Sequence, residues 1–409
     1  NDTLKFSKFR KSITVYGFTN YKKKFKNKYI NIETEKKIFQ SQNKDYVSKF
    51  IEIEKKQPSN IIELHNRPIY LKYLVNELQN KNYILYFHND PLSMSGSKTI
   101  SERMFLLSNC YRIVFNSNWS KKRFLQGMQN KFINSDKLLV VFQSAKKNKL
   151  NLKVKSKWIT FVGKLNKSKG YDLFAAAIVK VLNKYPDWKS YVIGDEQRDK
   201  ISVNHKNLKK LGFLKHEKVL NIYKKTSIAI VCSRWEEPFG RTSLEAASNS
   251  CAVIISNRGG LPETITNGII LEKLSVKNLI NQIELLIKNK KLRERLQILS
   301  NKNFYLSHSY VSKLIDTFRD SKLKINNFYL NKKSNKNLRI LHLTNFNERH
   351  DGRLYFNTGR RLNNGFIRLG HSILEFSDRD IQKYYKNYKD LSGSKRLKYW
   401  LLIALSSGL

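Results

Sequence analysis

Two glutamates on either side of a short proline- and glycine-containing loop are the first candidates for chemistry. Glu237 and Glu245 are separated by seven residues, among them Gly240. The apolar run 228–232 before the loop predicts a buried parallel strand, and the residues after Gly240 predict a helix. The first amides of a helix are unpaired donors at its positive end, so Gly240–Ser243 predict an anion site, most often for phosphate. Two carboxylates beside such a site indicate a ligand with phosphate and hydroxyl groups, as in a nucleotide sugar.

The same loop also has an ordinary structural explanation, because many helices begin after proline and glycine, and an early glutamate compensates the helix dipole. A resemblance favours the binding site. The paired glutamates and the Pro-Phe-Gly between them resemble the motif of the retaining GT-B glycosyltransferases of family 4. The resemblance is dense over residues 158–320, moderate over 58–145 and poor before them. It implies an enzyme that transfers a sugar from a nucleoside-diphosphate sugar with retained anomeric configuration.

A second glycine-bearing loop lies upstream, between a predicted strand and a predicted helix. Its residues 163–170 include Gly163, Lys164 and Lys169. Lysines at this place can neutralise a diphosphate leaving group, although lysine is common throughout this chain. The loop resembles the family's Gly-Arg…Lys-Gly loop, with Lys164 in place of the usual arginine. This exchange keeps the charge but loses the bidentate fork, so we expect weaker orientation of the phosphates.

Two histidines, His65 and His88, each end a predicted strand. In open parallel sheets, ligands bind beyond the carboxyl ends of the strands. For either histidine alone, a residue that merely ends a strand is the ordinary explanation. The resemblance places His88 near the transferred sugar and the acceptor, and it gives His65 a structural role.

The resemblance also implies a division of labour. Glu237 would accept hydrogen bonds from the donor sugar and Glu245 from the ribose, while His88 would bond to the sugar or the incoming hydroxyl. His88 and Glu237 are therefore the predicted catalytic residues. Because the leaving phosphate is expected to help deprotonate the acceptor, no side chain is assigned as general base. The predicted donor-binding residues are Gly163, Lys164, Lys169, Gly240, Arg241, Thr242, Ser243 and Glu245.

Alternating strand and helix patterns predict an α/β protein with parallel, doubly wound sheets. The resemblance implies the GT-B type, in which two Rossmann-like doubly wound domains face a cleft. Residues 1–146 form the predicted acceptor-side domain, and residues 150–325 the nucleotide-sugar-binding domain. The basic linker Lys146–Lys149 is expected to be flexible. Residues 1–20 lack the family's Gly-rich loop, so we expect the first domain to lack its first strand and loop. The last helix, 311–320, is expected to pack back on that domain.

Two further stretches resemble parts of the family's cleft. Gly259–Glu263 is either a tight turn or a cleft lining, and Leu211–Leu214 resembles the base-contacting segment. The predicted strands are 13–16, 61–64, 83–87, 112–115, 138–142, 158–162, 190–193, 228–232 and 252–255. The predicted helices are 46–56, 68–79, 98–107, 119–129, 174–181, 279–288 and 311–320.

The tail repeats the beginning of such a domain. Residues 338–409 carry a strand at 338–343, a glycine loop, a helix and a strand at 372–376, which predict a partial third Rossmann-like segment. The tail resembles the N-terminal domain of a further glycosyltransferase module of the spore-maturation-protein type. Asp378–Asp380 has the spacing of metal-dependent sugar transferases, but we interpret it as coincidence and expect no metal site. The residues expected to line the tail's loop are Arg353, Asn357, Arg360 and Arg361.

The composition favours anionic partners. Of the 409 residues, 78 are Lys or Arg and 32 are Asp or Glu, which gives a net charge of +46. The lysines are scattered along the chain rather than gathered in one stripe, so nucleic acid is a weaker expectation than nucleotide phosphate. Three widely spaced cysteines, Cys110, Cys232 and Cys251, indicate buried free thiols in a reducing compartment. No apolar run reaches the roughly 20 residues of a membrane span.

We therefore expect a cytoplasmic enzyme whose donor is a nucleotide sugar and which needs no other cofactor. The acceptor stays open among saccharide, lipid and protein, and a basic chain can also dock on an anionic membrane to reach a lipid. Two alternatives remain at this point. One is a nucleotide-sugar epimerase of the same fold, and the other is a non-catalytic, basic nucleic-acid-binding protein.

Overall fold

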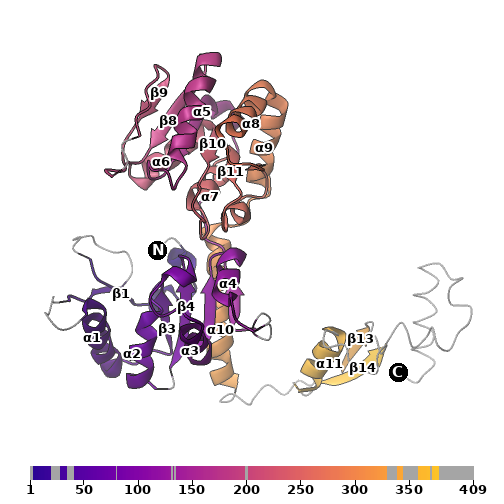
Figure 1. Ribbon diagram of the computed structural model, residues 1–409. Coiled ribbons are helices and arrows are strands. Elements are labelled where there is room, and N and C mark those ends of the chain that lie inside the picture. Colours follow the sequence, from indigo (N-terminus) through magenta and orange to yellow (C-terminus); the bar gives the residue numbers. More distant parts are fainter. Residues whose placement is uncertain are drawn as a thin grey trace, which may run out of the picture. The chain divides into compact units, whose positions relative to one another are not determined.

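A computed structural model gives the arrangement of the chain (Figure 1). The residues that it describes are 3–19, 28–34, 41–79, 81–129, 132, 135–198, 201–328, 339–343, 358–368 and 371–376. The chain divides into two compact units, residues 1–326 and residues 327–409. Within its described residues, the first unit contains two large parallel sheets, which define an N-terminal lobe and a C-terminal lobe.

The N-terminal lobe is built on a parallel sheet in the order β3-β4-β5-β6. Its strands alternate with helices, as the sequence pattern predicts, and their apolar faces form one core that includes Phe87, Phe115 and Phe124. A separate pair of short parallel strands precedes it. The elements are β1 (Val15–Gly17), β2 (Tyr29–Asn31), α1 (Gln42–Lys56), β3 (Ile61–His65), α2 (Ile69–Glu77), β4 (Asn82–Phe87), α3 (Ile100–Asn109), β5 (Cys110–Phe115), α4 (Asn118–Leu125) and β6 (Leu138–Val140).

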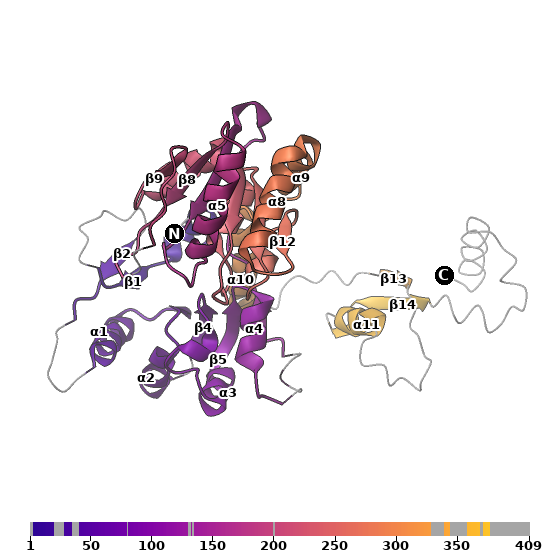
Figure 2. The same ribbon diagram turned by 45° about the horizontal axis from the view of Figure 1, so that its top comes forward.

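The C-terminal lobe carries a six-stranded parallel sheet in the order β12-β11-β10-β7-β8-β9. Counted from its own first strand, this is the order 3-2-1-4-5-6 of a Rossmann fold, with helices on both faces. Figure 2 shows α5 and α8 side by side on one face, where they share a core with the sheet. The elements are β7 (Ser156–Val162), α5 (Tyr171–Lys184), β8 (Lys189–Ile193), β9 (Leu208–Lys210), α6 (His216–Lys225), β10 (Thr226–Val231), α7 (Arg241–Ser248), β11 (Ala252–Ser256), β12 (Ile269–Leu271), α8 (Val276–Lys288) and α9 (Lys290–Lys302).

The long helix α10 (His308–Phe328) leaves the C-terminal lobe and runs along the sheet of the N-terminal lobe (Figure 1). Val311 joins a core with Ile84 and Val114 of that sheet, and Phe239 and Leu244 of the C-terminal lobe enter the same core. The expected packing of the last helix against the first lobe is therefore confirmed. One apolar cluster also joins the two lobes.

The linker between the lobes was expected to be flexible, but it is tied down by hydrogen bonds. Lys147 Nζ donates to the carbonyl of Phe304 at 3.1 Å. The amide of Asn148 donates to the carbonyl of Ser248 at 3.3 Å. The segment is thus held against the C-terminal lobe rather than free of it, because its polar groups meet the carbonyls at helix ends.

The second unit contains a strand, a helix and a strand: β13 (Arg339–Leu343), α11 (Thr358–Arg368) and β14 (Ser372–Phe376). The two strands pair in parallel, as the predicted Rossmann-like start requires. A further glycosyltransferase module stays a prediction. The loop residues Arg353 and Asn357, the Arg360 side chain and the stretch Asp378–Asp380 lie outside the described residues.

The predicted strands of both lobes are confirmed, with boundaries that differ by at most a few residues, and so are the predicted helices. The sequence pattern did not reveal β2, β9, α6, β12 and α9. These elements are short, or rich in lysine and glutamate, so their apolar period is weak. Within the described ranges, none of the helices has the length and apolar character needed to cross a bilayer.

Candidate functional site

The strand order of the C-terminal lobe brings two distant loops together. Neighbouring strands β7 and β10 lead into helices on opposite faces, so a crevice opens at their carboxyl ends. The amides of Arg234 and Trp235 both donate to the carbonyl of Ser168 at 2.9 Å. Lys169 Nζ lies 2.5 Å from Glu237 Oε1, which joins two predicted site residues from different loops.

Gly170 makes this close approach possible. Its backbone has φ of 71°, and a Cβ at this position would lie 1.9 Å from the carbonyl oxygen of Cys232. Only glycine fits such a contact without displacing the backbone. Gly163 begins the same loop and donates its amide to the carbonyl of Ile193 at 3.0 Å. Lys164 follows it with an exposed side chain.

The helix α7 begins at Arg241, directly after Gly240. Its first intrahelical bond runs from the amide of Leu244 to the carbonyl of Gly240 at 3.4 Å, so the amides of residues 241–243 precede the helical ladder. The Ser243 hydroxyl is buried, donates to the Gly240 carbonyl at 2.7 Å and lies 2.6 Å from the Thr264 hydroxyl. Ser243 can therefore serve an anion through its amide but not through its side chain.

Glu245 is buried on α7 and is held by a histidine and an arginine side chain. Its Oε1 lies 3.0 Å from His216 Nε2 and 3.1 Å from Arg241 Nη2. Sequence reasoning identified Glu245 and Arg241 but missed His216, the first residue of α6. A signal was present, since His216 lies two positions after Leu214, at the end of the segment that resembles the family's base-contacting stretch. The carboxylate is thus fixed in orientation while His216 and Arg241 remain largely exposed.

Gly259–Glu263 proves to be an inter-lobe contact. Glu263 accepts hydrogen bonds from the amides of Asn118 and Trp119, at 2.7 and 2.9 Å, at the start of α4 in the N-terminal lobe. The amide of Gly260 donates to the carbonyl of Glu237 at 2.6 Å. A carboxylate at a helix N-terminus is stabilising, so this stretch caps a helix of the other lobe and braces the Glu237 loop at the same time.

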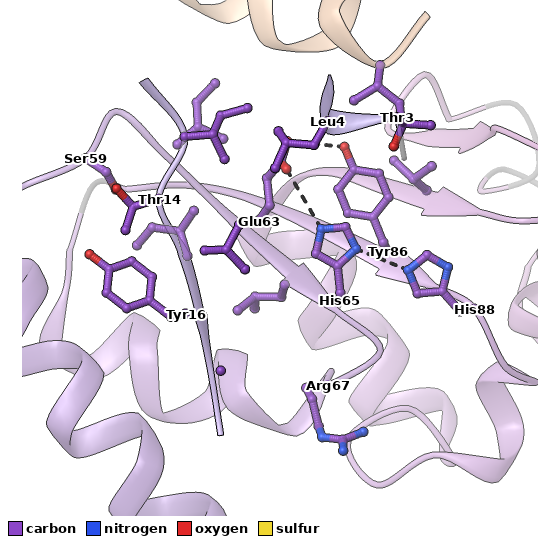
Figure 3. Close-up of a pocket in the computed structure, with 18 of the residues that line it drawn as sticks. Thr3, Leu4, Thr14, Tyr16, Ser59, Glu63, His65, Arg67, Tyr86 and His88 are labelled. Carbon is purple, nitrogen blue, oxygen red and sulfur yellow. Dashed lines mark hydrogen bonds and ion pairs between the residues drawn. The ribbon is translucent and has the colours of Figure 1, made fainter. Parts of the chain in front are cut away.

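His65 and His88 lie at the carboxyl ends of the neighbouring strands β3 and β4, and their rings face one another. His65 Nδ1 lies 3.1 Å from His88 Nε2 (Figure 3). Asn66 has the left-handed φ of 61° that asparagine tolerates, and its Oδ1 accepts from the amides of His88 and Asn89. Burial comes first among the causes that lower the pKa of His88 to about 4, followed by the charges of His65 and Arg241. His88 is therefore neutral at pH 7.

A largely buried ionic network faces His65 through Glu63. Arg319 of α10 donates to Glu63 Oε1 and Oε2 at 2.8 and 2.7 Å, and to Asp316 at 2.9 Å. Ser7 also donates to Asp316 at 2.7 Å. Burial alone would raise the pKa of Glu63, but its contacts with His65 and Arg319 outweigh burial and lower the pKa to about 2. Glu63 therefore stays ionised throughout the neutral range.

A cavity of about 1300 Å³ lies in front of the histidines (Figure 3). Its walls include His65, His88 and the Arg241 side chain, so residues of both lobes face the same space. Aromatic rings also line the cavity, with Tyr16 against Phe50 at a centroid distance of 5.0 Å. Further aromatic lining residues are Phe18, Tyr46, Tyr70 and Tyr86.

Part of the chain matches known proteins in sequence. Residues 142–302 match the family model described as "Glycosyl transferases group 1". The chain is 30% identical over 157 residues to spore coat protein SA of Bacillus subtilis (strain 168), an alignment that covers 34% of this chain and 42% of that protein. It is 30% identical over 131 residues to the GPI3 subunit of phosphatidylinositol N-acetylglucosaminyltransferase from Saccharomyces cerevisiae, covering 30% and 29%. The chain thus spans less than half the length of these curated relatives.

A longer alignment, at 24% identity over 310 residues, joins the chain to an uncharacterized glycosyltransferase of Haemophilus influenzae, covering 71% of this chain and 84% of that protein.

Solved structures extend the likeness to both lobes. A glycosyltransferase from Rickettsia africae has a TM-score of 0.58 at 20% identity, covering 75% of this chain and 86% of its own. Anabaena HepE in complex with UDP-glucose has a TM-score of 0.57 at 15% identity, covering 72% and 86%. The predicted α/β architecture with parallel sheets is therefore confirmed, and the fold is similar to that of the GT-B glycosyltransferases. The match to the group 1 family model covers residues 142–302, less than half of the chain.

Proposed function

We propose that this protein transfers a sugar from a nucleoside-diphosphate sugar to an acceptor, with retention of the anomeric configuration. The observation that carries the proposal is the 2.5 Å pair of Lys169 and Glu237 at the Rossmann switch point, beside the free amides of α7. A cation and amide donors suit a diphosphate, and a carboxylate suits sugar hydroxyls. The binding of UDP-glucose by the structurally similar HepE supports the same donor class.

Donor binding would rearrange the Lys169–Glu237 pair. A diphosphate at the start of α7 brings two negative charges that compete with Glu237 for the Lys169 ammonium. When Lys169 turns to the phosphates, the Glu237 carboxylate becomes available to the hydroxyls of the donor sugar. The same cation, with the α7 amides, then stabilises the charge that grows on the diphosphate as the glycosidic bond breaks.

The Glu245 carboxylate suits the ribose. Both of its contacts with His216 and Arg241 use Oε1, at 3.0 and 3.1 Å, which fixes the plane of the group. A carboxylate fixed in this way can accept hydrogen bonds from two neighbouring ribose hydroxyls. Glu245 thus serves recognition of the nucleoside and takes no part in bond breaking.

The acceptor would enter from the cavity in front of His65 and His88. A neutral His88 can exchange hydrogen bonds with a hydroxyl without adding charge to the site. The leaving phosphate lies on the face from which the acceptor attacks in a retaining transfer, so it can take the hydroxyl proton. No side chain is then needed as general base.

A thermal-shift screen with UDP-, GDP- and ADP-sugars tests the proposal, because a ligand that binds only the folded state raises the melting temperature. We expect a shift with one nucleotide class, lost in Glu245→Ala and kept in Glu272→Ala, an exposed glutamate of the same lobe. The absence of a shift with every donor would overturn the proposal. Conversion of the donor to its epimer without any acceptor would favour an epimerase instead.

A further inference from the structure

The contact between His65 and His88 carries an inference about which nitrogen of His88 faces the reaction. Their facing atoms, Nδ1 of His65 and Nε2 of His88, lie 3.1 Å apart (Figure 3). At this distance the two rings share one proton between the facing nitrogens, so one nitrogen donates and the other accepts. The choice between the two arrangements decides whether the remaining nitrogen of His88 is a donor or an acceptor.

We propose that His65 is a positioning residue, which accepts a hydrogen bond from Nε2–H of His88. Nδ1 of His88 is then left as an acceptor for a substrate hydroxyl, and this part of the proposal rests on the proposed function. The family resemblance gave His65 only a structural role. The geometry gives it a chemical one, because it sets the tautomer of its neighbour.

The direction of the shared proton follows from Glu63. Its Oε2 lies 3.9 Å from Nε2 of His65, on the far side of the ring from His88. A carboxylate facing one ring nitrogen favours N–H at that nitrogen. With its N–H at Nε2, His65 carries its lone pair at Nδ1. His65 must then accept from His88, and Nδ1 of His88 keeps its own lone pair.

The Glu63 carboxylate, which decides the direction of the His65–His88 hydrogen bond, is itself held in place. Arg319 donates to both of its oxygens at 2.8 and 2.7 Å, and the Tyr86 hydroxyl donates to Oε1 at 3.3 Å. The ring of His65 also stacks on Tyr86, with centroids 4.5 Å apart and planes 9° apart. Charge and packing thus fix both the ionisation of Glu63 and the plane of His65.

The assignment has a direct consequence for binding. With Nδ1 as an acceptor, His88 orients a hydroxyl by receiving its proton in a hydrogen bond, which turns an oxygen lone pair toward the donor sugar. The opposite tautomer would present an N–H and occupy that lone pair. Because the proton is shared and not transferred, His88 stays neutral throughout.

Long-range ¹H–¹⁵N correlation spectra of the full chain with labelled histidine test the tautomer, with His88 assigned by its loss in His88→Gln. We expect His88 to be protonated at Nε2. Two variants separate the proton from the packing. His65→Asn keeps an acceptor oxygen near the position of Nδ1, whereas His65→Phe keeps the stack on Tyr86 but has no nitrogen.

We expect His65→Asn to keep the tautomer of His88 and to turn over donor within about threefold of the wild type. His65→Phe should give mixed tautomers and a fall in kcat of about tenfold, the worth of one hydrogen bond. A wild-type His88 protonated at Nδ1, or an unchanged tautomer in His65→Phe, would overturn the assignment. The spectra need no substrate, so a failure to bind any nucleotide sugar would overturn the proposed function and leave the tautomer assignment standing.

Discussion

The two lobes build their parts of the site in different ways. In the C-terminal lobe, the loops after adjacent strands β7 and β10 meet directly, and Lys169 pairs with Glu237 across 68 positions of sequence. In the N-terminal lobe, His65 contacts His88 on one side and faces Glu63 on the other. Arg319, the partner of Glu63, is 256 positions away from it on α10. The first arrangement follows from strand order alone, while the second requires the whole unit to be assembled.

The crevice of the C-terminal lobe and the histidine edge of the N-terminal lobe should therefore depend on different contacts for their stability. The crevice of the C-terminal lobe keeps its loops together as long as its own sheet is intact. The histidine edge depends on α10, which starts in one lobe and packs on the other. Loss of α10 contacts should therefore loosen β3 and β4 and leave β7 and β10 unaffected.

The largest expected effect comes from removing Arg319. Arg319→Met leaves Glu63 and Asp316 buried without their cation, and breaking a buried pair in this way costs roughly 3 kcal/mol. Native-state hydrogen exchange should show this loss in the amides of β3 and β4 but not in those of β10.

Arg123→Met serves as a control for Arg319→Met, because Arg123 pairs with Asp90 while about a third of its side chain is exposed, at 34%. Its loss should cost less than about 1 kcal/mol. An equal effect of the two variants, or equal loosening of both lobes by Arg319→Met, would break the comparison.

Low pH should destabilise the same part of the N-terminal lobe, the edge that carries Glu63 and His65. The pKa of Glu63 falls from 4.5 to about 2 on folding. A lowered pKa contributes stability above the unfolded value, and that stability is lost as the pH falls from 4.5 toward 2. The full shift corresponds to about 3 kcal/mol. Hydrogen exchange at pH 5 and pH 2.5 should therefore show selective weakening of β3, and in Glu63→Gln this pH dependence should disappear.

In the C-terminal lobe, the contact between the two loops depends on Gly170. Gly170→Ala forces a Cβ to within 1.9 Å of the Cys232 carbonyl oxygen and places alanine at φ of 71°. We expect a loss of more than about 2 kcal/mol, together with weaker nucleotide binding, because the two loops must separate. Gly212 is the control, since its φ is 63° but nothing lies within 4 Å of an added Cβ. Gly212→Ala should cost only about 1 kcal/mol in urea unfolding.

The same contrast explains what the sequence could predict. Alternating apolar runs identified the strands and therefore the crevice, because parallel strands place their loops at one edge. Lys169, Glu237 and Glu245 lie on such loops or directly after them.

The missed parts depend on packing between distant segments. Arg319 and Asp316 look like ordinary charges on a surface helix, and nothing local indicates that they are buried against β3. His216 is similar, because its contact with Glu245 depends on α6 lying beside α7. Glu263 was noticed, but its bonds to α4 become visible only when the two lobes are assembled.

The smallest expected effect concerns Lys164, where the family resemblance implies arginine. The side chain is exposed at the start of the loop that follows β7, so a replacement costs no packing. Lys164→Arg restores a planar fork that can bind a phosphate through two parallel hydrogen bonds. One added bond in a solvated setting should tighten binding of the donor's nucleoside diphosphate by about threefold in calorimetry. Lys180→Arg, an equally exposed exchange on α5, should change nothing. Equal affinities for the Lys164 variant and the wild type would show that Lys164 does not reach the phosphates, leaving the charge of this crevice to Lys169 and the amides of α7.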